Sequence, residues 1–200
     1  MKVIGVIGQN GSGKDEVLKY LQAEYGIPFL STGDMVREIA TKEGLAPTTE
    51  NLGEISARYF REQGRGCFIR IVADRIRQNG WQIAGISGIR SLDDVIALRE
   101  SFGKDFILVH VFVTDPHLRY ARMSKRGEDR DPHSYEPFLK QDEAEEELFH
   151  IREAIGYTRY SLKNDGTVDD LRQEIEKVMR RIVHWMSRVK RFSYTSEDTS

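Results

Sequence analysis

The feature that most constrains this chain is a glycine-rich turn between a short apolar run and a helical pattern. Gly8-Gln9-Asn10-Gly11-Ser12-Gly13-Lys14 directly follows the apolar run Lys2–Ile7, and apolar residues then recur at helical spacing. This is the G-x-x-x-x-G-K spacing of a phosphate loop, in the strand–turn–helix context that such a loop requires. Glycines let backbone N–H groups converge on phosphate oxygens, the helix N-terminus adds partial positive charge, and Lys14 reaches the terminal phosphates. The sequence therefore predicts nucleotide contacts from Gly8 through Asp15.

The residue after this lysine departs from the usual pattern. Ser or Thr at that position supplies a hydroxyl to Mg²⁺, whereas this chain has Asp15. A carboxylate is an equally hard oxygen donor, so Mg²⁺ binding is still expected. Asp15 also adds a negative charge near the triphosphate, which the metal and Lys14 must offset.

Short apolar runs alternate with helical patterns along the chain, which favours an α/β fold with a five-stranded parallel sheet. The first and fourth runs are apolar almost throughout, as strands buried on both faces are. The predicted strands are Lys2–Ile7, Pro28–Leu30, Trp81–Ile86, Phe106–Val113 and Tyr160–Lys163.

Two stretches interrupt the strand–helix rhythm and predict insertions on the rim of the sheet, where substrate loops and lids lie. Residues at about 34–79 hold several helical segments, and residues at about 119–150 hold a basic cluster and an acidic helix. We expect a single domain over residues 1–190. Residues 191–200 are polar and aperiodic and predict a frayed tail.

Composition excludes several other classes of protein. Of 200 residues, 39% are hydrophobic and 31% are charged, and no apolar run approaches the ~18 residues that a membrane span needs. The net charge of -2 gives no reason to expect nucleic acid or an anionic membrane as a partner. Cys67 is the only cysteine, which excludes an intramolecular disulfide. The apolar N-terminal run is too short for a signal peptide, so a cytoplasmic location is expected.

Two segments resemble the acceptor-binding motifs of adenylate kinases. Ser31-Thr32-Gly33-Asp34-Met35-Val36-Arg37 resembles the Ser-Thr-Gly-Asp-Met-x-Arg motif of that family. There the Thr lies against the acceptor nucleotide and the Arg binds its phosphate. The resemblance gives these roles to Thr32 and Arg37, with Gly33 and Asp34 beside them. Ser87-Gly88-Ile89-Arg90 is similar to the Asp-Gly-x-x-Arg segment of the same superfamily, so Arg90 is the second arginine expected at the acceptor phosphate. Two guanidiniums can bind one phosphate bidentately, although either arginine alone could form a surface salt bridge.

Other stretches are similar to the archaeal-type proteins described as dephospho-CoA kinase-related P-loop kinases. The similarity includes residues 47–54, 89–94 and 125–132, and it runs from about residue 2 to 185. It implies a three-layer P-loop NTPase fold, with an acceptor-binding helical insertion, a lid, and ATP and Mg²⁺ as cofactors. The motifs that carry this similarity are specific for the fold and the general chemistry, but they say little about which substrate is used.

The resemblance also suggests how the metal site is built. In that branch a Ser or Thr follows the loop lysine and an Asp ends the third strand. Here the carboxylate is at Asp15 and the hydroxyl is at Ser87, so the two groups look exchanged across the magnesium site. The alternative is that Asp15 only caps the helix, where a carboxylate is favourable, and that Ser87 is a small packing residue.

Arginines are concentrated at the start of the second insertion. Arg119, Arg122 and Arg126 are spaced i, i+3 and i+7, which places them on one helical face. One interpretation is a solvated helix pair, in which these charges complement the acidic run 142–147. The other resembles a kinase lid, with Arg122 and Arg126 as transition-state arginines and Arg119 next. The lid latches would then be Glu128, Asp129 and Asp131.

We therefore expect Mg²⁺-dependent phosphoryl transfer from ATP to a small phosphorylated acceptor, first of all a nucleoside or deoxynucleoside monophosphate. Asn164 follows the last predicted strand, where related kinases hold the adenine ring, and is a candidate contact. A dephospho-CoA kinase-like transfer to a hydroxyl, with Asp34 as base, is one alternative. A regulator that binds ATP with little turnover is another. The basic last helix has the charge that suits a helix C-terminus, and a homodimer contact there is left open.

Overall fold

The computed structural model describes residues 1–127 and 131–193, with side chains up to residue 183. Within that range the strands form one parallel sheet in the order β2-β3-β1-β4-β5. Their bounds are β1 (Lys2–Ile7), β2 (Phe29–Ser31), β3 (Ile83–Ser87), β4 (Phe106–Phe112) and β5 (Tyr160–Lys163). The predicted five-stranded parallel α/β fold is confirmed.

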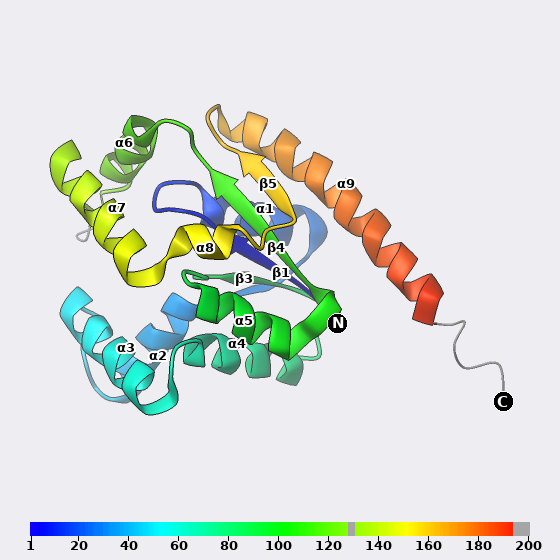
Figure 1. The fold of residues 1–200 in the computed structure, drawn as a ribbon, viewed down its shortest axis with the longest axis horizontal. Helices are drawn as coiled ribbons and strands as arrows, with labels where there is room; N and C mark the ends of the chain where they lie inside the picture. The colour runs from blue at the N-terminus through cyan, green and yellow to red at the C-terminus, as the bar shows by residue number, and fades with distance from the viewer. Residues whose placement is uncertain (128–130, 194–200) are drawn as a thin grey trace.

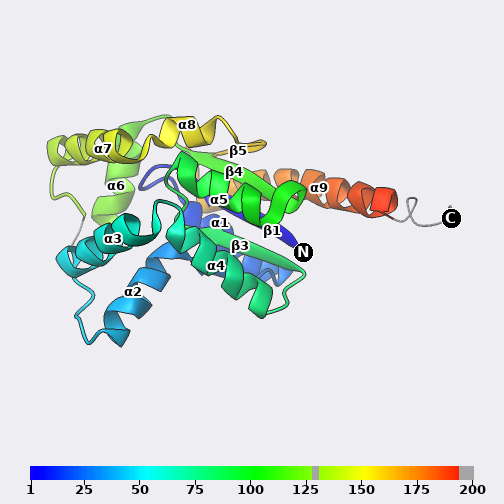
Figure 2. The same cartoon turned by 60° about the horizontal axis from the view of Figure 1, so that its bottom comes forward.

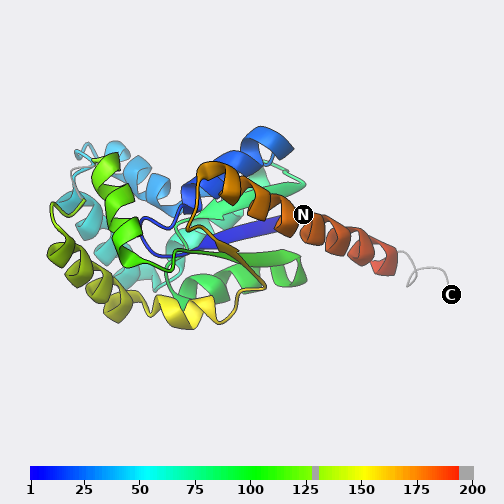
Figure 3. The ribbon, with the colours of Figure 1, turned by 90° about the horizontal axis from the view of Figure 1, so that it is seen from above.

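Helices cover both faces of the sheet, which explains why its central strands are apolar throughout. On β1, Val3 and Ile7 join the core under α4, α5 and α8, whereas Ile4 and Val6 join the core under α1 and α9. This alternation follows from the two-residue period of a strand. Figures 1 and 3 show the two helical layers on either side of the strands. The helices are α1 (Lys14–Tyr25), α4 (Cys67–Gln78), α5 (Leu92–Phe102), α8 (Ile151–Ile155) and α9 (Val168–Ser193).

Helix starts follow the capping signals of the sequence. Ser91 and Asp94 form a reciprocal capping box at α5. Thr167 and Asp170 make the same exchange at the start of α9, where each side chain accepts from the other residue's backbone N–H. These caps satisfy N–H groups that have no partner inside the helix, so they fix where each helix begins.

The two insertions lie at the end of the sheet to which the strands point, as Figures 1 and 2 show. At this end the first contains α2 (Thr32–Lys42) and α3 (Thr49–Gln63), and the second contains α6 (Pro116–Arg126) and α7 (Tyr135–Phe149). Helix α4, which falls within the bounds predicted for the first insertion, instead covers a face of the sheet. A 3-10 turn, η1 (Gly103–Asp105), precedes β4. Ligands of open α/β sheets bind at this carboxyl end, beside the strand where the strand order reverses. Here that strand is β1, which continues into the phosphate loop.

The predicted tail begins too early, because α9 continues to Ser193. Residues 194–200 of that tail lie outside the described residues, as do the predicted latches Glu128 and Asp129. Among the described residues, none of the helices combines the length and apolarity that a membrane crossing requires.

Candidate functional site

The phosphate loop is held against α6 and the segment after β5. Gly11 has φ of +75° and lies so close to α6 that an added Cβ would come within 2.7 Å of the Arg119 carbonyl oxygen. Gly13 has φ of +95° and faces the Asn164 side chain. Both positions therefore require glycine for conformation and for space. Asn164 is buried, and its Nδ2 donates to the Ser12 carbonyl at 2.8 Å.

Lys14 begins α1, and its ammonium group donates to the Gln9 carbonyl at 2.9 Å. Burial lowers the pKa of Lys14 from 10.5 to about 8, Asp15 and Glu145 oppose the shift, and Arg90 and Arg126 add to it. Desolvation of a cation among other cations favours the neutral amine. An arriving phosphate would reverse that balance, because it supplies the counter-charge that the site lacks.

A pocket of about 580 Å³ opens beside the loop and is large enough for a nucleotide-sized ligand. Its wall holds cations from three separate helices, α1, α2 and α6, and from the turn after β3. They are Lys14, Lys19, Arg37, Arg90, Arg122 and Arg126. Asp15, Glu16 and Glu145 are the carboxylates in the same wall. Excess positive charge in a concave site of this kind favours a polyanion.

The pocket brings together the two arginines predicted for the acceptor phosphate, Arg37 of α2 and Arg90 after β3. Asp34 forms an ion pair with Arg37 but does not line the pocket. The guanidinium of Arg90 lies 5.7 Å from the ring centroid of Phe149, at the end of α7. Ser31 and Gly33 also line the pocket, whereas Thr32 Oγ1 donates to the Gly88 carbonyl at 3.0 Å. Of the predicted acceptor residues, Gly33, Arg37 and Arg90 line the pocket, whereas Thr32 and Asp34 do not.

Asp15 and Ser87 meet as expected at the adjoining ends of β1 and β3. Ser87 Oγ donates to Asp15 Oδ1 at 3.0 Å, and both residues line the pocket. Because β1 and β3 are adjacent parallel strands, with Gly5 paired to Ile86, the loop and helix that follow β1 begin beside Ser87. Carboxylate and hydroxyl oxygens are both hard donors, so this pair fits a magnesium site that is completed by phosphate oxygens and waters.

The three arginines of α6 separate into two groups. Arg122 and Arg126 line the pocket. Arg122 donates to the carbonyls of Asn164 and Gly166, at 2.8 and 3.2 Å, and burial lowers its pKa. Arg126 pairs with the buried Asp131. Arg119 does not line the pocket, because its guanidinium is buried and ion-paired to Asp142 of α7.

Not every residue predicted to contact the nucleotide lines the pocket with its side chain. Gln9 and Ser12 do not line the pocket, so any phosphate contact from them would come from their backbone N–H groups. The Ser12 hydroxyl is buried, without a hydrogen-bond partner in the described part of the chain. Asn164 lines the pocket, but its amide already serves Ser12 and Arg122. Its adenine contact remains a prediction.

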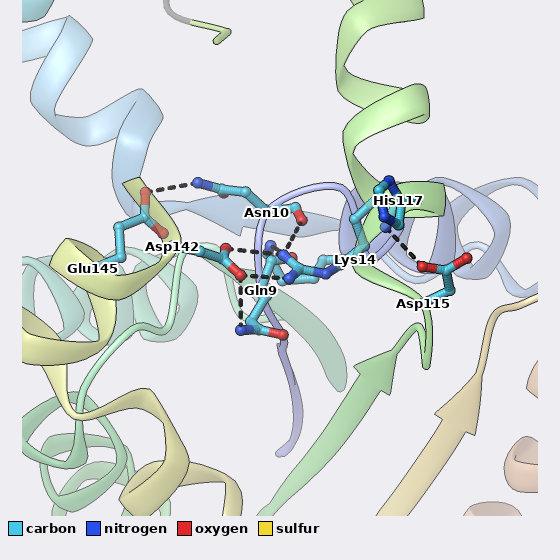
Figure 4. A network of polar contacts seen from close by, with 8 residues as sticks. Gln9, Asn10, Lys14, Asp115, His117, Asp142 and Glu145 are labelled. Carbon is cyan, nitrogen blue, oxygen red and sulfur yellow. Dashed lines mark hydrogen bonds and ion pairs between the residues drawn. The ribbon is translucent and has the colours of Figure 1, made fainter. Parts of the chain in front are cut away.

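Sequence reasoning missed the carboxylates of α7 that reach the phosphate loop. Asp142 accepts from Gln9 Nε2 at 3.2 Å, and Glu145 accepts from Asn10 Nδ2 at 2.7 Å, as Figure 4 shows. Their i, i+3 spacing inside the acidic run places them on one face of α7. That spacing was the available signal, but the sequence does not say that this face meets the loop.

Comparisons with known proteins agree with this fold and its phosphate loop. A family model described as an AAA domain matches residues 7–138, more than half of the chain. A UPF0200 protein from Thermococcus onnurineus is 32% identical over 183 residues, which cover 90% of this chain and 98% of that protein. A UPF0200 protein from Methanosarcina mazei is 31% identical over 179 residues, which cover 90% and 94%.

Solved structures of similar fold include small-molecule kinases. A gluconokinase from Sinorhizobium meliloti 1021 aligns with a TM-score of 0.61 at 17% identity, covering 93% of this chain and 95% of that one. Shikimate kinase from Acinetobacter baumannii aligns with a TM-score of 0.55 at 17% identity, covering 92% and 94%. Identity this low shows the fold alone. The chain thus has the fold of P-loop small-molecule kinases, contains an AAA domain, and belongs to the UPF0200 family.

Proposed function

We propose that this protein is a Mg²⁺-dependent kinase that transfers the γ-phosphoryl group of ATP to a small phosphorylated acceptor. The observation that carries the proposal is the arrangement of cations in one pocket. Lys14 and the phosphate loop line it together with Arg37 and Arg90, and Arg122 and Arg126 of α6 join the same wall. A donor triphosphate and an acceptor phosphate would each find cations there.

The chain's own residues would act by positioning and by electrostatic stabilisation. The N–H groups of the loop and the Lys14 ammonium would hold the β and γ phosphates. An acceptor phosphate oxygen would attack the γ phosphorus as the bond to the β–γ bridging oxygen breaks, releasing ADP. Arg122 and Arg126 would stabilise charge on the transferred group. A phosphate acceptor needs no strong base, because its attacking oxygen is already ionised.

Asp15 and Ser87 are the residues that would hold Mg²⁺. When bound, Mg²⁺ would supply positive charge to the phosphate oxygens. The described residues contain no cluster of three or more His, Cys, Asp or Glu side chains suited to a metal. The Asp15–Ser87 pair suits Mg²⁺, which is commonly held by one or two carboxylates together with substrate phosphates and waters. Asp15 would contribute its carboxylate directly or through a water, and Ser87 would orient a water or that carboxylate.

For the acceptor, a nucleoside or deoxynucleoside monophosphate is the first candidate. The motif around Arg37 and the arginine after β3 resemble adenylate kinases, and the dephospho-CoA kinase-related branch supplies the wider similarity. Transfer to a hydroxyl is the second candidate, although Asp34, the base expected for it, pairs with Arg37 and does not line the pocket. The neighbours named gluconokinase and shikimate kinase make that class worth including in the assay.

Steady-state turnover over a panel of acceptors tests the proposal. The panel contains ribo- and deoxyribonucleoside monophosphates, dephospho-CoA, gluconate and shikimate, each with MgATP. Turnover with a monophosphate supports the first candidate, and turnover with only a hydroxyl acceptor supports the second. Tight MgATP binding with no turnover on any acceptor would instead favour an ATP-binding regulator.

A further inference from the structure

The inward face of α7 contacts the phosphate loop through two carboxylates. Asp142 and Glu145 point from α7 to Gln9 and Asn10, the two residues between the first and second glycines of the loop (Figure 4). Gln9 is also the residue whose carbonyl accepts from Lys14. The two carboxylates therefore contact the two non-glycine residues that lie between Gly8 and Gly11.

Asp142 anchors α7 to α6. It accepts from the Arg119 guanidinium, and the two side chains are only 15% and 4% exposed. Arg119 Nη1 also donates to the Asn10 carbonyl at 3.2 Å. The guanidinium lies 5.0 Å from the ring centroid of Phe138, also on α7. This buried set fixes where α7 lies relative to the loop, and so fixes where Glu145 points.

Glu145 differs from Asp142 because it also lines the nucleotide pocket. Its charge opposes the lowering of the pKa of Lys14, so it acts electrostatically on the loop lysine. A carboxylate in a phosphate-binding pocket repels the ligand, which by itself is unfavourable. A compensating role is needed to account for it, and the hydrogen bond from Asn10 supplies one.

We propose that Glu145 is a positioning residue of the nucleotide site: through Asn10 it fixes the first half of the phosphate loop in the shape that binds the triphosphate. The inference rests on the proposed nucleotide site and does not depend on which acceptor is used. Its charge and its hydrogen bond act in opposite directions. The charge weakens phosphate binding, whereas the hydrogen bond orders the loop and strengthens it.

Two substitutions separate these effects. Glu145→Gln keeps an oxygen that accepts from Asn10 and removes the charge, so MgATP-analogue affinity should equal or exceed that of the wild type. Glu145→Ala removes both, so its affinity should lie about five- to tenfold below that of Glu145→Gln, the effect of one lost hydrogen bond of ~1–1.4 kcal/mol. Asn10→Ala should cause a similar loss, and the Asn10→Ala/Glu145→Ala double variant should be no weaker than the weaker single variant.

The measurement is calorimetric binding of a non-hydrolysable ATP analogue with Mg²⁺, with the melting temperature of each variant recorded in the absence of nucleotide. Glu143→Ala is the matched control, because Glu143 is exposed on the same helix. Its affinity should equal that of the wild type. An affinity of Glu145→Ala equal to or above that of Glu145→Gln, or additive losses in the double variant, would each overturn the proposal. Binding without turnover removes the kinase proposal alone, whereas no binding by the wild type removes both.

Discussion

Ser87, the last residue of β3, donates a hydrogen bond of 3.0 Å from its Oγ to Oδ1 of Asp15 in the first turn of α1. The contact joins two positions that are 72 residues apart in the chain. It also joins the two residues whose chemistry departs from the usual P-loop arrangement of a hydroxyl after the lysine. Their proximity makes the exchange of donors testable as a coupled pair.

We predict that Asp15→Ser raises the Mg²⁺ concentration needed for half-maximal rate, and that adding Ser87→Asp restores much of the loss. The second change returns one carboxylate to the same oxygen cluster, so the effects should be coupled. Glu16→Ser is the control, because it removes the same charge one residue later and has no contact with Ser87. Mn²⁺ binding measured by electron paramagnetic resonance should follow the same order. Strictly additive effects on both readouts would contradict an exchanged metal site.

Lys14→Ala should reduce phosphoryl transfer by about 100-fold or more, the usual effect of removing one preorganised charge-stabilising group. The melting temperature should change little, since Lys14 lines the pocket and contributes to neither face of the sheet core. Lys19→Ala, which removes an exposed lysine from the rim of the same pocket, is the control. A Lys14→Ala variant that retains the wild-type kcat would remove the loop from the reaction.

Nucleotide affinity should fall as pH rises above about 8, the pKa of Lys14 in the free protein. The phosphates favour the charged amine, so its pKa is higher in the complex and binding takes up a proton above pH 8. Well above that pH, the affinity should fall by roughly tenfold per pH unit until the pKa of the complex is reached. Calorimetry at pH 9 in two buffers of different ionisation enthalpy measures the proton uptake. Affinity that is flat from pH 7 to 9.5 would show that Lys14 binds phosphate without a change in protonation.

Arg37→Ala and Arg90→Ala should raise the acceptor KM and leave MgATP affinity nearly unchanged. Each removes a charged hydrogen bond of about 1.5–3 kcal/mol, which corresponds to roughly 10- to 100-fold in KM. Arg75→Ala is the control, because Arg75 pairs with Glu38 outside this pocket. Weakened MgATP binding with an unchanged acceptor KM would place these arginines at the donor end.

Replacing Arg119 should reduce the stability of the fold, whereas replacing Arg126 should reduce the rate of phosphoryl transfer. Arg119→Ala leaves the Asp142 carboxylate without its buried partner, so the free energy of unfolding should drop by about 3–5 kcal/mol. Arg126→Ala should instead lower kcat by roughly 100-fold, because its guanidinium lines the pocket. Urea unfolding and single-turnover rates distinguish the two outcomes. A stable Arg119→Ala variant with a greatly reduced kcat would return Arg119 to the catalytic group.

The sequence by itself determined the layered fold, the phosphate loop and the helix starts. These features depend on local patterns: the two-residue period of β1, the glycine spacing from Gly8 to Gly13, and capping pairs such as Ser91 and Asp94. The expected proximity of Asp15 and Ser87 came from the resemblance to P-loop kinases, and the structure bears it out because β1 and β3 are adjacent parallel strands.

Only the tertiary structure decided which charged side chains reach the pocket. The spacing of Arg119, Arg122 and Arg126 places them on one helical face, yet packing of α7 buries the first against Asp142 and leaves the other two in the pocket wall. Likewise, Asn10 and Glu145 are 135 residues apart. No local pattern encodes that contact, because it depends on how α7 docks on α6 and on the loop, and docking is set by side-chain packing and buried charge across the whole fold.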